Sequence, residues 1–298
     1  MLGNWMKWCE YVKQDLSWKT LLALPQCLLS FCIGATYDTL PSPSNLVRWK
    51  KQENKGCTFC NKSTSTTSHI LGACPYSLKQ GRYTYRHDKV LSALIKTIQN
   101  FLSVYKPVLS LPKKINFVPE GHSKSANKKK PPLGLLHFAN DWILLGDLDT
   151  QLIVPPYLAV TQLRPDILLI SKTTKKVIII ELTCPCEENM PTWHEKKYDK
   201  YSPLCAAIKS NGWSVNLFAV EVGARGYCSE TVRSCLRRLG FTNKLCRSAL
   251  KSLSTTSMKC SFYIFLSRDK TAAWKMKILL LLLQKSLLLP NQDLSLKI

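Results

Sequence analysis

The sequence predicts an α/β fold in which a mixed β-sheet is flanked by helices. Two apolar runs, Ile167–Ile170 and Val177–Ile180, stand on either side of a polar stretch and indicate a hairpin of buried strands. A helix-like spacing of apolar residues follows from Pro191 onward, and a further strand is expected at Val215–Val222. Alternation of strands and helices in this order is typical of an α/β core.

Other elements are expected from local patterns. The segment around "TLPSPSNLVRW" should form a Pro/Ser turn, because both residue types favour turns. The apolar spacing further predicts helices at Val90–Leu102, around Phe138–Leu145, over Thr231–Leu239 and in a last segment that ends at Arg268.

The register of the hairpin brings two acids together. Ile167 should face Ile180, and Asp166 should therefore face Glu181 across the open end of the hairpin. Two carboxylates at an apolar site repel each other unless a cation lies between them. This predicts an Mg²⁺ or Mn²⁺ site and a phosphodiesterase, although residue types alone equally allow two solvated acids on a hairpin.

The helix after the hairpin carries a candidate catalytic lysine. Lys197 shares a helix face with Trp193 and Tyr201, so its ammonium should point towards the sheet. A lysine at a carboxylate–metal centre can orient water and stabilise the charge on phosphate. Lys200 lies about 60° round the helix and is a second candidate, whereas Lys196 should face solvent.

These residues resemble a known nuclease core. Asp166, fourteen intervening residues and then Glu181-x-Thr183 resemble the PD-(D/E)xK core, except that Thr183 stands where its lysine belongs. The string "LRPDILLIS…VIIIELTCPCEENM…HEKKYDKY…GW…VEVGARGY" resembles the restriction-like endonuclease of site-specific non-long-terminal-repeat retrotransposons, where the lysine has moved to the next helix. The resemblance implies catalytic roles for Lys197, Lys200 and Tyr201. The chain departs from that pattern at Cys184 and Cys186.

Four soft ligands predict a zinc knuckle. Cys57-x2-Cys60-x8-His69-x4-Cys74 supplies three thiolates and an imidazole, a set that closes a tetrahedral Zn²⁺ site. The alternative is four unrelated core residues, since such spacings recur by accident in cysteine-rich chains. The segments "DTLPSPSNLVRW" and "GRYTYRHDKVL" around the quartet resemble the same retrotransposon region, which lies between reverse transcriptase and nuclease.

Cations alternate with aromatic residues after the quartet. Such a segment favours contact with phosphates and unpaired bases. His87 could serve as a metal ligand but lies outside the quartet, so an ordinary polar contact is expected. The predicted nucleic-acid-binding residues are Arg82, Tyr83, Tyr85, Arg86, Lys89 and, next to the acid pair, Arg164.

Composition limits the kinds of partner and the cellular compartment that are expected. The 298 residues carry a net charge of +23, which implies a polyanionic partner: target DNA, RNA or an anionic membrane surface. Thirteen scattered cysteines do not form a secreted disulfide framework. The apolar stretches are too short to span a membrane and no export signal is recognisable, so an intracellular protein of the nucleus or cytoplasm, without a small-molecule cofactor, is expected.

The expected organisation has five parts. They are a helical segment (1–50), the zinc knuckle with its basic extension (51–90), a helix and Lys-rich linker (91–132), the endonuclease (133–274) and a Leu-rich tail (275–298). No paired aspartates of a polymerase site occur, so by resemblance the chain is a nuclease that nicks target DNA to prime reverse transcription by a polymerase not present here. The alternatives are a catalytically inactive nucleic-acid-binding remnant and a membrane-surface protein.

Overall fold

The computed structural model describes residues 23–104, 133–148 and 150–268. Within this range the chain forms two compact units, one made of residues 23–86 and 258–268 and the other of residues 87–257. Both boundaries fall inside long helices. Residues 1–22 of the predicted helical segment (1–50), residues 105–132 of the predicted helix and Lys-rich linker (91–132) and the whole predicted tail (275–298) lie outside the described residues.

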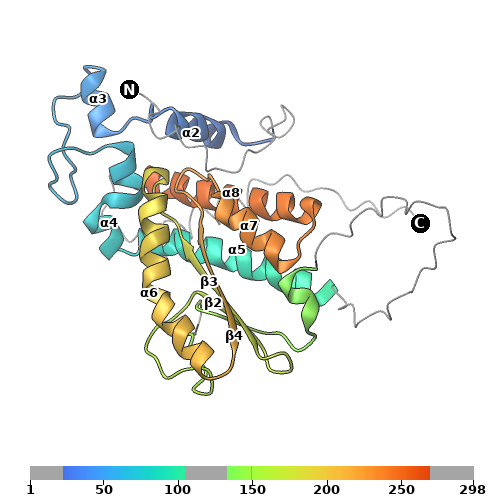
Figure 1. Ribbon diagram of the computed structural model, residues 1–298. Coiled ribbons are helices and arrows are strands. Elements are labelled where there is room, and N and C mark those ends of the chain that lie inside the picture. The colour runs from blue at the N-terminus through green and yellow to red at the C-terminus, as the bar shows by residue number, and fades with distance from the viewer. Residues whose placement is uncertain (1–22, 105–132, 149, 269–298) are drawn as a thin grey trace, which may run out of the picture. The chain divides into compact units, whose positions relative to one another are not determined.

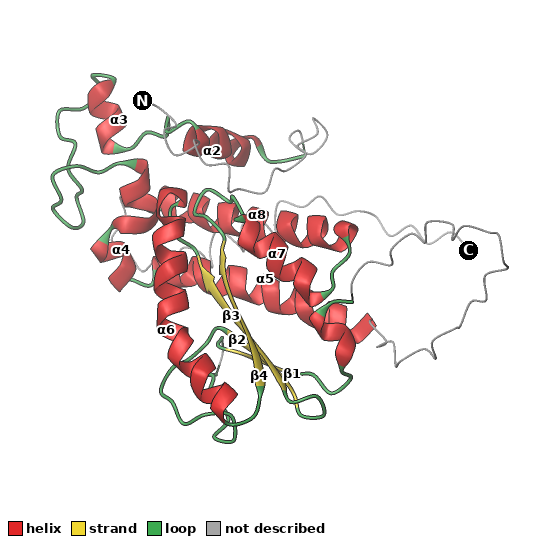
Figure 2. Cartoon of the chain, in the orientation of Figure 1, coloured by secondary structure: helices red, strands yellow, loops and turns green. Residues whose placement is uncertain are grey.

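The larger unit contains a four-stranded sheet (Figures 1 and 2). Its strands, in spatial order, are β1 (Ile143–Gly146), β2 (Ile167–Ser171), β3 (Lys176–Thr183) and β4 (Ser214–Glu221). The first three are antiparallel neighbours, whereas β3 and β4 run parallel. Helix α6 (Met190–Ser210) connects the parallel pair, which cannot be joined by a tight turn. The prediction of an α/β fold with a mixed sheet and flanking helices is confirmed.

The β2–β3 hairpin has the predicted register. Ile167 pairs with Ile180 and Ile170 pairs with Val177. The connecting turn contains Lys175 at a positive φ of 48°. Asp141 accepts hydrogen bonds from the backbone and hydroxyl of Thr173, at 2.9 and 2.7 Å, which ties the turn to the chain before β1.

Both faces of the sheet are covered, as the continuous apolar runs of its strands require. Side chains such as Ile178, Ile180 and Val220 pack against residues 87–104 of α5 (Arg82–Val104), α7 (Glu230–Leu239) and residues 243–257 of α8 (Asn243–Leu266). The alternate side chains, such as Ile179, pack against Leu204 and Ile208 of α6. Figure 1 shows α6 on one side of the sheet and α5 and α7 on the other.

One predicted helix is wrong. The segment around Phe138–Leu145 forms a 3₁₀ turn, η3 (Leu135–Phe138), followed by strand β1. The strand forms because Ile143–Gly146 pairs with the exposed edge of β2, a long-range partner that local periodicity does not reveal. The indole of Trp142 donates to the carbonyl of Leu136 and fixes the corner between them at 3.1 Å.

The smaller unit is helical. It contains α2 (Gln26–Thr36), α3 (Pro43–Arg48), the π-helical turn η2 (His69–Ala73) and α4 (Pro75–Lys79). It also includes the first residues of α5, 82–86, and the last residues of α8, 258–266. The Pro/Ser stretch predicted as a turn instead starts α3. Ser42 accepts the Asn45 N–H as an N-cap, and Pro43 suits the first helical turn because its missing N–H is not needed there.

No helix in the residues that the structure describes has both the length and the apolar character needed to cross a membrane.

Candidate active site and zinc centre

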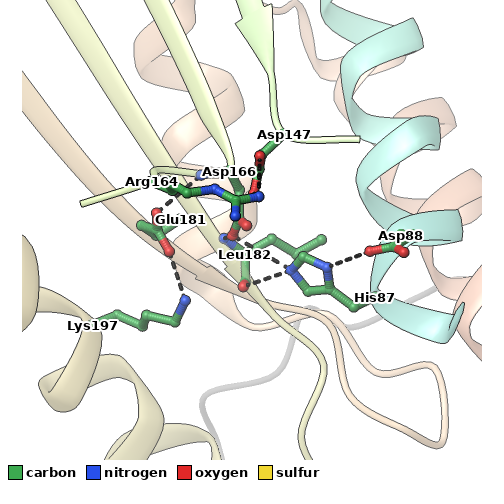
Figure 3. Close-up of polar contacts among 8 residues, drawn as sticks. All are labelled: His87, Asp88, Asp147, Arg164, Asp166, Glu181, Leu182 and Lys197. Atoms are coloured by element: carbon green, nitrogen blue, oxygen red, sulfur yellow. Dashed lines mark hydrogen bonds and ion pairs between the residues drawn. The ribbon is translucent and has the colours of Figure 1, made fainter. Parts of the chain in front are cut away.

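Asp166 and Glu181 meet at the end of the hairpin, as the register predicts (Figure 3). The backbone N–H of Asp166 donates to Oε1 of Glu181 at 3.0 Å. In return, the N–H of Leu182 donates to Oδ2 of Asp166 at 2.7 Å. Asp166 is only 8% exposed and Glu181 only 1% exposed. Each buried carboxylate thus accepts a backbone N–H from the opposite side of the hairpin.

Lys197 reaches this pair from α6. Its Nζ atom lies 2.7 Å from Oε2 of Glu181, on the free side of the carboxylate. One helical turn further on, the hydroxyl of Tyr201 donates to the carbonyl of Arg164 at 2.7 Å and anchors the helix face to the segment that contains Asp166, just before β2. Lys200 is exposed, with its ammonium 4.9 Å from the ring of Tyr201. The predicted helix phase of Lys197 is therefore observed.

The two carboxylates are electrostatically unlike. Burial, and then the neighbouring Asp166 charge, raise the pKa of Glu181 to about 7, although Lys197 acts in the opposite direction. Burial would also raise the pKa of Asp166, but the hydrogen bond and charge of His87, together with Lys197, lower it. A carboxylate pair that is costly to charge fully is a favourable place for a cation.

His87 is the main residue of this site that sequence analysis missed. It lies near the start of α5, with Nε2 3.3 Å from the carbonyl oxygen of Leu182 and 3.5 Å from Oδ2 of Asp166. Its Nδ1 lies 3.1 Å from Oδ1 of Asp88. Burial lowers the pKa of His87, but the carboxylates of Asp166 and Asp88 outweigh burial and raise it to about 10. The predicted polar contact is therefore observed, and Asp166 of the acid pair is one of its partners.

Arg164 and Asp147 close another side of the site (Figure 3). The Nη2 atom of Arg164 lies 2.8 and 2.9 Å from the two carboxylate oxygens of Asp147. Asp147 follows β1 and donates its N–H to the carbonyl of Asp166 at 2.9 Å. Arg164, predicted to contact nucleic acid, thus has a carboxylate partner, and its side chain is still 45% exposed. Asp147 carried no sequence signal because β1 itself was predicted as a helix.

The Cys/His quartet comes together in the smaller unit. The ligand atoms of Cys57, Cys60, His69 and Cys74 all lie within 4.8 Å of one another. The Sγ atoms of Cys57 and Cys74 are 4.0 Å apart, and Sγ of Cys60 is 3.4 Å from Nε2 of His69. With Zn–S and Zn–N bonds of usual length, a tetrahedral ion requires separations of about 3.8 and about 3.6 Å. The cluster therefore has the donor set and spacing to bind a zinc ion.

A tight turn and a π-helical turn build this quartet. The N–H of Cys57 donates to the carbonyl of Lys62 at 2.8 Å, and Asn61 adopts a positive φ of 55° inside the turn. This directs the first two thiols to one side. His69 is the first residue of η2, and Cys74 directly follows that element. The second pair thus comes from the two ends of one short helical turn.

The basic aromatic segment differs from the prediction. It forms the first turns of α5, where Arg82 and Arg86 are each 1% exposed. Nη1 of Arg82 donates to the carbonyl of Ser267 at 2.8 Å, and Nη1 of Arg86 donates to the carbonyl of Leu71 at 2.7 Å. The hydroxyl of Tyr83 donates towards the carbonyls of His69 and Ile70. The assignment of both arginines to nucleic-acid contact is corrected, because their buried guanidinium groups satisfy main-chain acceptors.

Two other members of this segment have different surroundings. Tyr85 is partly buried, and burial followed by the charges of Cys260 and Tyr263 raises its pKa. Lys89 is exposed. Of the predicted nucleic-acid-binding residues of α5, Lys89 is therefore the one whose side chain faces solvent.

Comparison with known proteins adds no family. No protein-family model matches the chain, and no curated protein matches it.

Proposed function

We propose that this chain is a metal-dependent DNA endonuclease that hydrolyses phosphodiester bonds. One observation carries the proposal: two buried carboxylates, from Asp166 and Glu181, converge with the ammonium of Lys197 at the end of a sheet. An exposed ion pair would be a common surface feature. Two acids sharing a buried site with one lysine are instead typical of a centre that binds a cation and acts on a charged substrate.

The residues at this site fit Mg²⁺ or Mn²⁺. Both ions prefer oxygen ligands, which the carboxylates of Asp166 and Glu181 and the carbonyl of Leu182 would supply. An ion held there would lower the pKa of a bound water and neutralise charge on the phosphate. Lys197 would orient the attacking water and stabilise the negative charge that develops on the phosphoryl oxygens. Tyr201 would hold the helix face of Lys197 through its bond to Arg164.

The position of the lysine supports one nuclease branch. Thr183 occupies the place of the PD-(D/E)xK lysine, and the structure brings an ammonium to Glu181 from α6 instead. This is the arrangement implied by the resemblance to restriction-like endonucleases of site-specific retrotransposons. On that basis the enzyme nicks target DNA, and the freed 3′-hydroxyl primes reverse transcription by a separate polymerase region. The net charge of +23 suits DNA and RNA as partners.

Plasmid nicking tests the proposal. The full chain should convert supercoiled DNA to the open-circular form with Mg²⁺ or Mn²⁺. Asp166→Ala and Glu181→Ala should each abolish nicking, while Glu230→Ala, which removes an exposed acid paired with Arg233, should not. DNA binding is measured in parallel by gel shift. Binding without metal-dependent nicking by the wild-type chain would reject the enzyme and favour an inactive nucleic-acid-binding remnant.

A further inference from the structure

His87 is positioned as a metal ligand would be. Its Nδ1 lies 3.1 Å from Oδ1 of Asp88, the neighbouring residue on α5. A divalent ion would displace the proton from Nε2, while the carboxylate of Asp88 keeps the Nδ1 proton and fixes the orientation of the ring. In metalloproteins this carboxylate–histidine arrangement is the usual support of an imidazole ligand.

The free side of the ring faces two further acceptors. Nε2 lies 3.3 Å from the Leu182 carbonyl and 3.5 Å from Oδ2 of Asp166 (Figure 3). Good N–H···O hydrogen bonds span about 2.7–3.2 Å, so both separations are long for direct bonds. With bonds of about 2.1 Å, neighbouring ligands of an octahedral ion lie about 3.0 Å apart. Nε2 thus lies from each of two oxygen atoms at a separation close to that between neighbouring ligands of one ion.

We propose that Nε2 of His87, Oδ2 of Asp166 and the carbonyl of Leu182 bind the same divalent ion, and that this imidazole makes the site prefer Mn²⁺ over Mg²⁺. The inference rests on the proposed function, because the ion is the one assigned to the nuclease. It adds a nitrogen ligand to a site otherwise made of oxygen atoms.

The chemistry of the ligands gives the preference its direction. Mg²⁺ is usually held by carboxylates, phosphates and retained water, and it gains little from imidazole. First-row transition ions bind imidazole more strongly, and Mn²⁺ also accepts carboxylate and carbonyl oxygens. The mixed set of one nitrogen and two oxygen atoms therefore matches Mn²⁺ better than Mg²⁺. Glu181, the second carboxylate proposed above for this ion, would add a further oxygen, and its Oε2 also contacts Lys197.

A competing arrangement uses the same contacts without a metal–nitrogen bond. Protonated His87 would form an ion pair with Asp166 and hold the carboxylate in place while the ion binds elsewhere. The two arrangements differ in one observable property, which is whether a histidine nitrogen is bonded directly to the metal.

Pulsed electron paramagnetic resonance of Mn²⁺ measures that property. The full chain is first loaded with Zn²⁺, so that the Cys/His quartet is occupied, and then receives one equivalent of Mn²⁺. We expect modulation of the electron spin echo by a directly bound ¹⁴N nucleus. Labelling all histidines with ¹⁵N should change the modulation in the unmutated chain, so this arm does not depend on the folding of a variant. If the wild-type chain shows no ¹⁴N modulation, or if the modulation does not change on ¹⁵N-histidine labelling, the proposal is overturned.

Variants then assign the nitrogen. His87→Gln should remove the modulation and weaken Mn²⁺ binding, measured by calorimetry, by at least about 10-fold, while changing Mg²⁺ affinity much less. Asp88→Asn should weaken Mn²⁺ by about 10- to 100-fold, because it withdraws the partner of Nδ1. His194→Gln is the matched control, since His194 pairs with Glu221, and it should keep the modulation. Modulation that survives His87→Gln in a folded variant would contradict the assignment.

The nuclease proposal can fail separately. A ¹⁴N signal that depends on His87, in a chain that nicks no DNA, would leave the metal site standing and reject the enzyme. Nicking that is equally efficient with both ions, without any ¹⁴N signal, would leave the enzyme standing and reject the role of His87.

Discussion

The ammonium of Lys197 lies 2.7 Å from Oε2 of Glu181. The side chain of Lys197 is 20% exposed, whereas that of Glu181 is 1% exposed. The Oε1 atom of the same carboxylate accepts the backbone N–H of Asp166. Glu181 therefore links the helix that follows the hairpin to Asp166, the residue that directly precedes β2. Each oxygen of the Glu181 carboxylate has its own donor. Removing the lysine therefore leaves the contact between the two acids in place, so mutations can test the lysine and the acids separately.

The lysines of α6 should differ in their effect on nicking. Lys197→Ala should lower the nicking rate by about 100- to 1000-fold, the usual cost of removing one preorganised charge-stabilising donor. Lys200→Ala should lower it less, because its ammonium lies over the Tyr201 ring. Lys196→Ala is the matched control, since this exposed lysine lies over Trp193. Single-turnover nicking assays measure all three, and a normal rate for Lys197→Ala would reject the assignment.

Zinc should be stoichiometric and structural. We expect one Zn²⁺ per chain by elemental analysis, and removal of the ion should unfold the turn that carries Cys57 and Cys60, because short metal knuckles gain most of their folding energy from the ion. Replacement by Co²⁺ should give the absorption bands of a tetrahedral thiolate site. His69→Ala and Cys74→Ser should lose the metal, whereas Cys27→Ser, at an exposed cysteine, should retain it. Full zinc content in His69→Ala would disprove the ligand set.

Arg86 should act on stability. Its Nη1 atom donates to the Leu71 carbonyl at 2.7 Å and to the Ser261 hydroxyl at 3.0 Å inside the smaller unit. Arg86→Ala leaves a buried carbonyl without this donor and should lower the free energy of unfolding by about 2–3 kcal/mol. Lys89→Ala, at an exposed position of the same helix, should change it little. Urea denaturation measures the difference, and an unchanged midpoint for Arg86→Ala would contradict a structural role.

The turn of the hairpin should lose stability in acid. Slight burial would raise the pKa of Asp141, but the hydroxyl and N–H of Thr173 and the hydroxyl of Ser171 outweigh it and hold the pKa below its usual value. A carboxylate with a lowered pKa in the folded state stabilises the fold above its unfolded pKa of about 3.9 and loses this contribution as the pH falls further. Asp141→Asn should therefore unfold more easily than wild type at neutral pH, and the difference should narrow below about pH 4.

Urea titrations at neutral and acidic pH test this dependence. Glu230→Gln provides the control, because its carboxylate, which is 41% exposed, pairs with Arg233 one turn along the same helix. A gap between Asp141→Asn and wild type that is constant with pH would show that the hydrogen bonds do not depend on the charge of Asp141.

Local sequence was sufficient for the part of the site that neighbouring segments build. The mirrored apolar runs set the β2–β3 register, and this register alone places Asp166 opposite Glu181. Helical spacing then directs Lys197 towards Glu181. These contacts join segments separated by one turn or one short loop, so hydrophobic periodicity contains the information that they need.

Contacts between segments that are distant in the sequence could not be predicted from local hydrophobic periodicity. His87 reaches Leu182 across 95 residues of sequence, and no local pattern reports such a pairing. Arg86 was predicted to contact nucleic acid because cations alternate with aromatic residues in its segment, yet its partner Ser261 is 175 residues away. Asp147 was missed because β1 gains its pairing from β2, and the short run "ILLG" does not distinguish a strand from a helix.

A threonine, Thr183, stands in the place of the usual PD-(D/E)xK lysine. Thr183 lies two residues after Glu181 on β3, so both side chains point to the same face of the sheet. It is 8% exposed, and its hydroxyl has no hydrogen-bond partner among the described residues. A lysine at this position would have its stem in the core and could extend its ammonium towards the same carboxylate that Lys197 contacts.

Thr183→Lys should therefore partly restore nicking to Lys197→Ala. On the wild-type background the same change should add no activity, because it places a second positive charge beside Glu181 and a longer side chain in a packed interior. Thr183→Met is the matched control for added length without charge, and it should not rescue Lys197→Ala. Circular dichroism of each variant verifies folding before the rates are compared. Equal recovery with methionine and lysine would show that packing against α6, rather than an ammonium near the acid pair, is what the double variant restores.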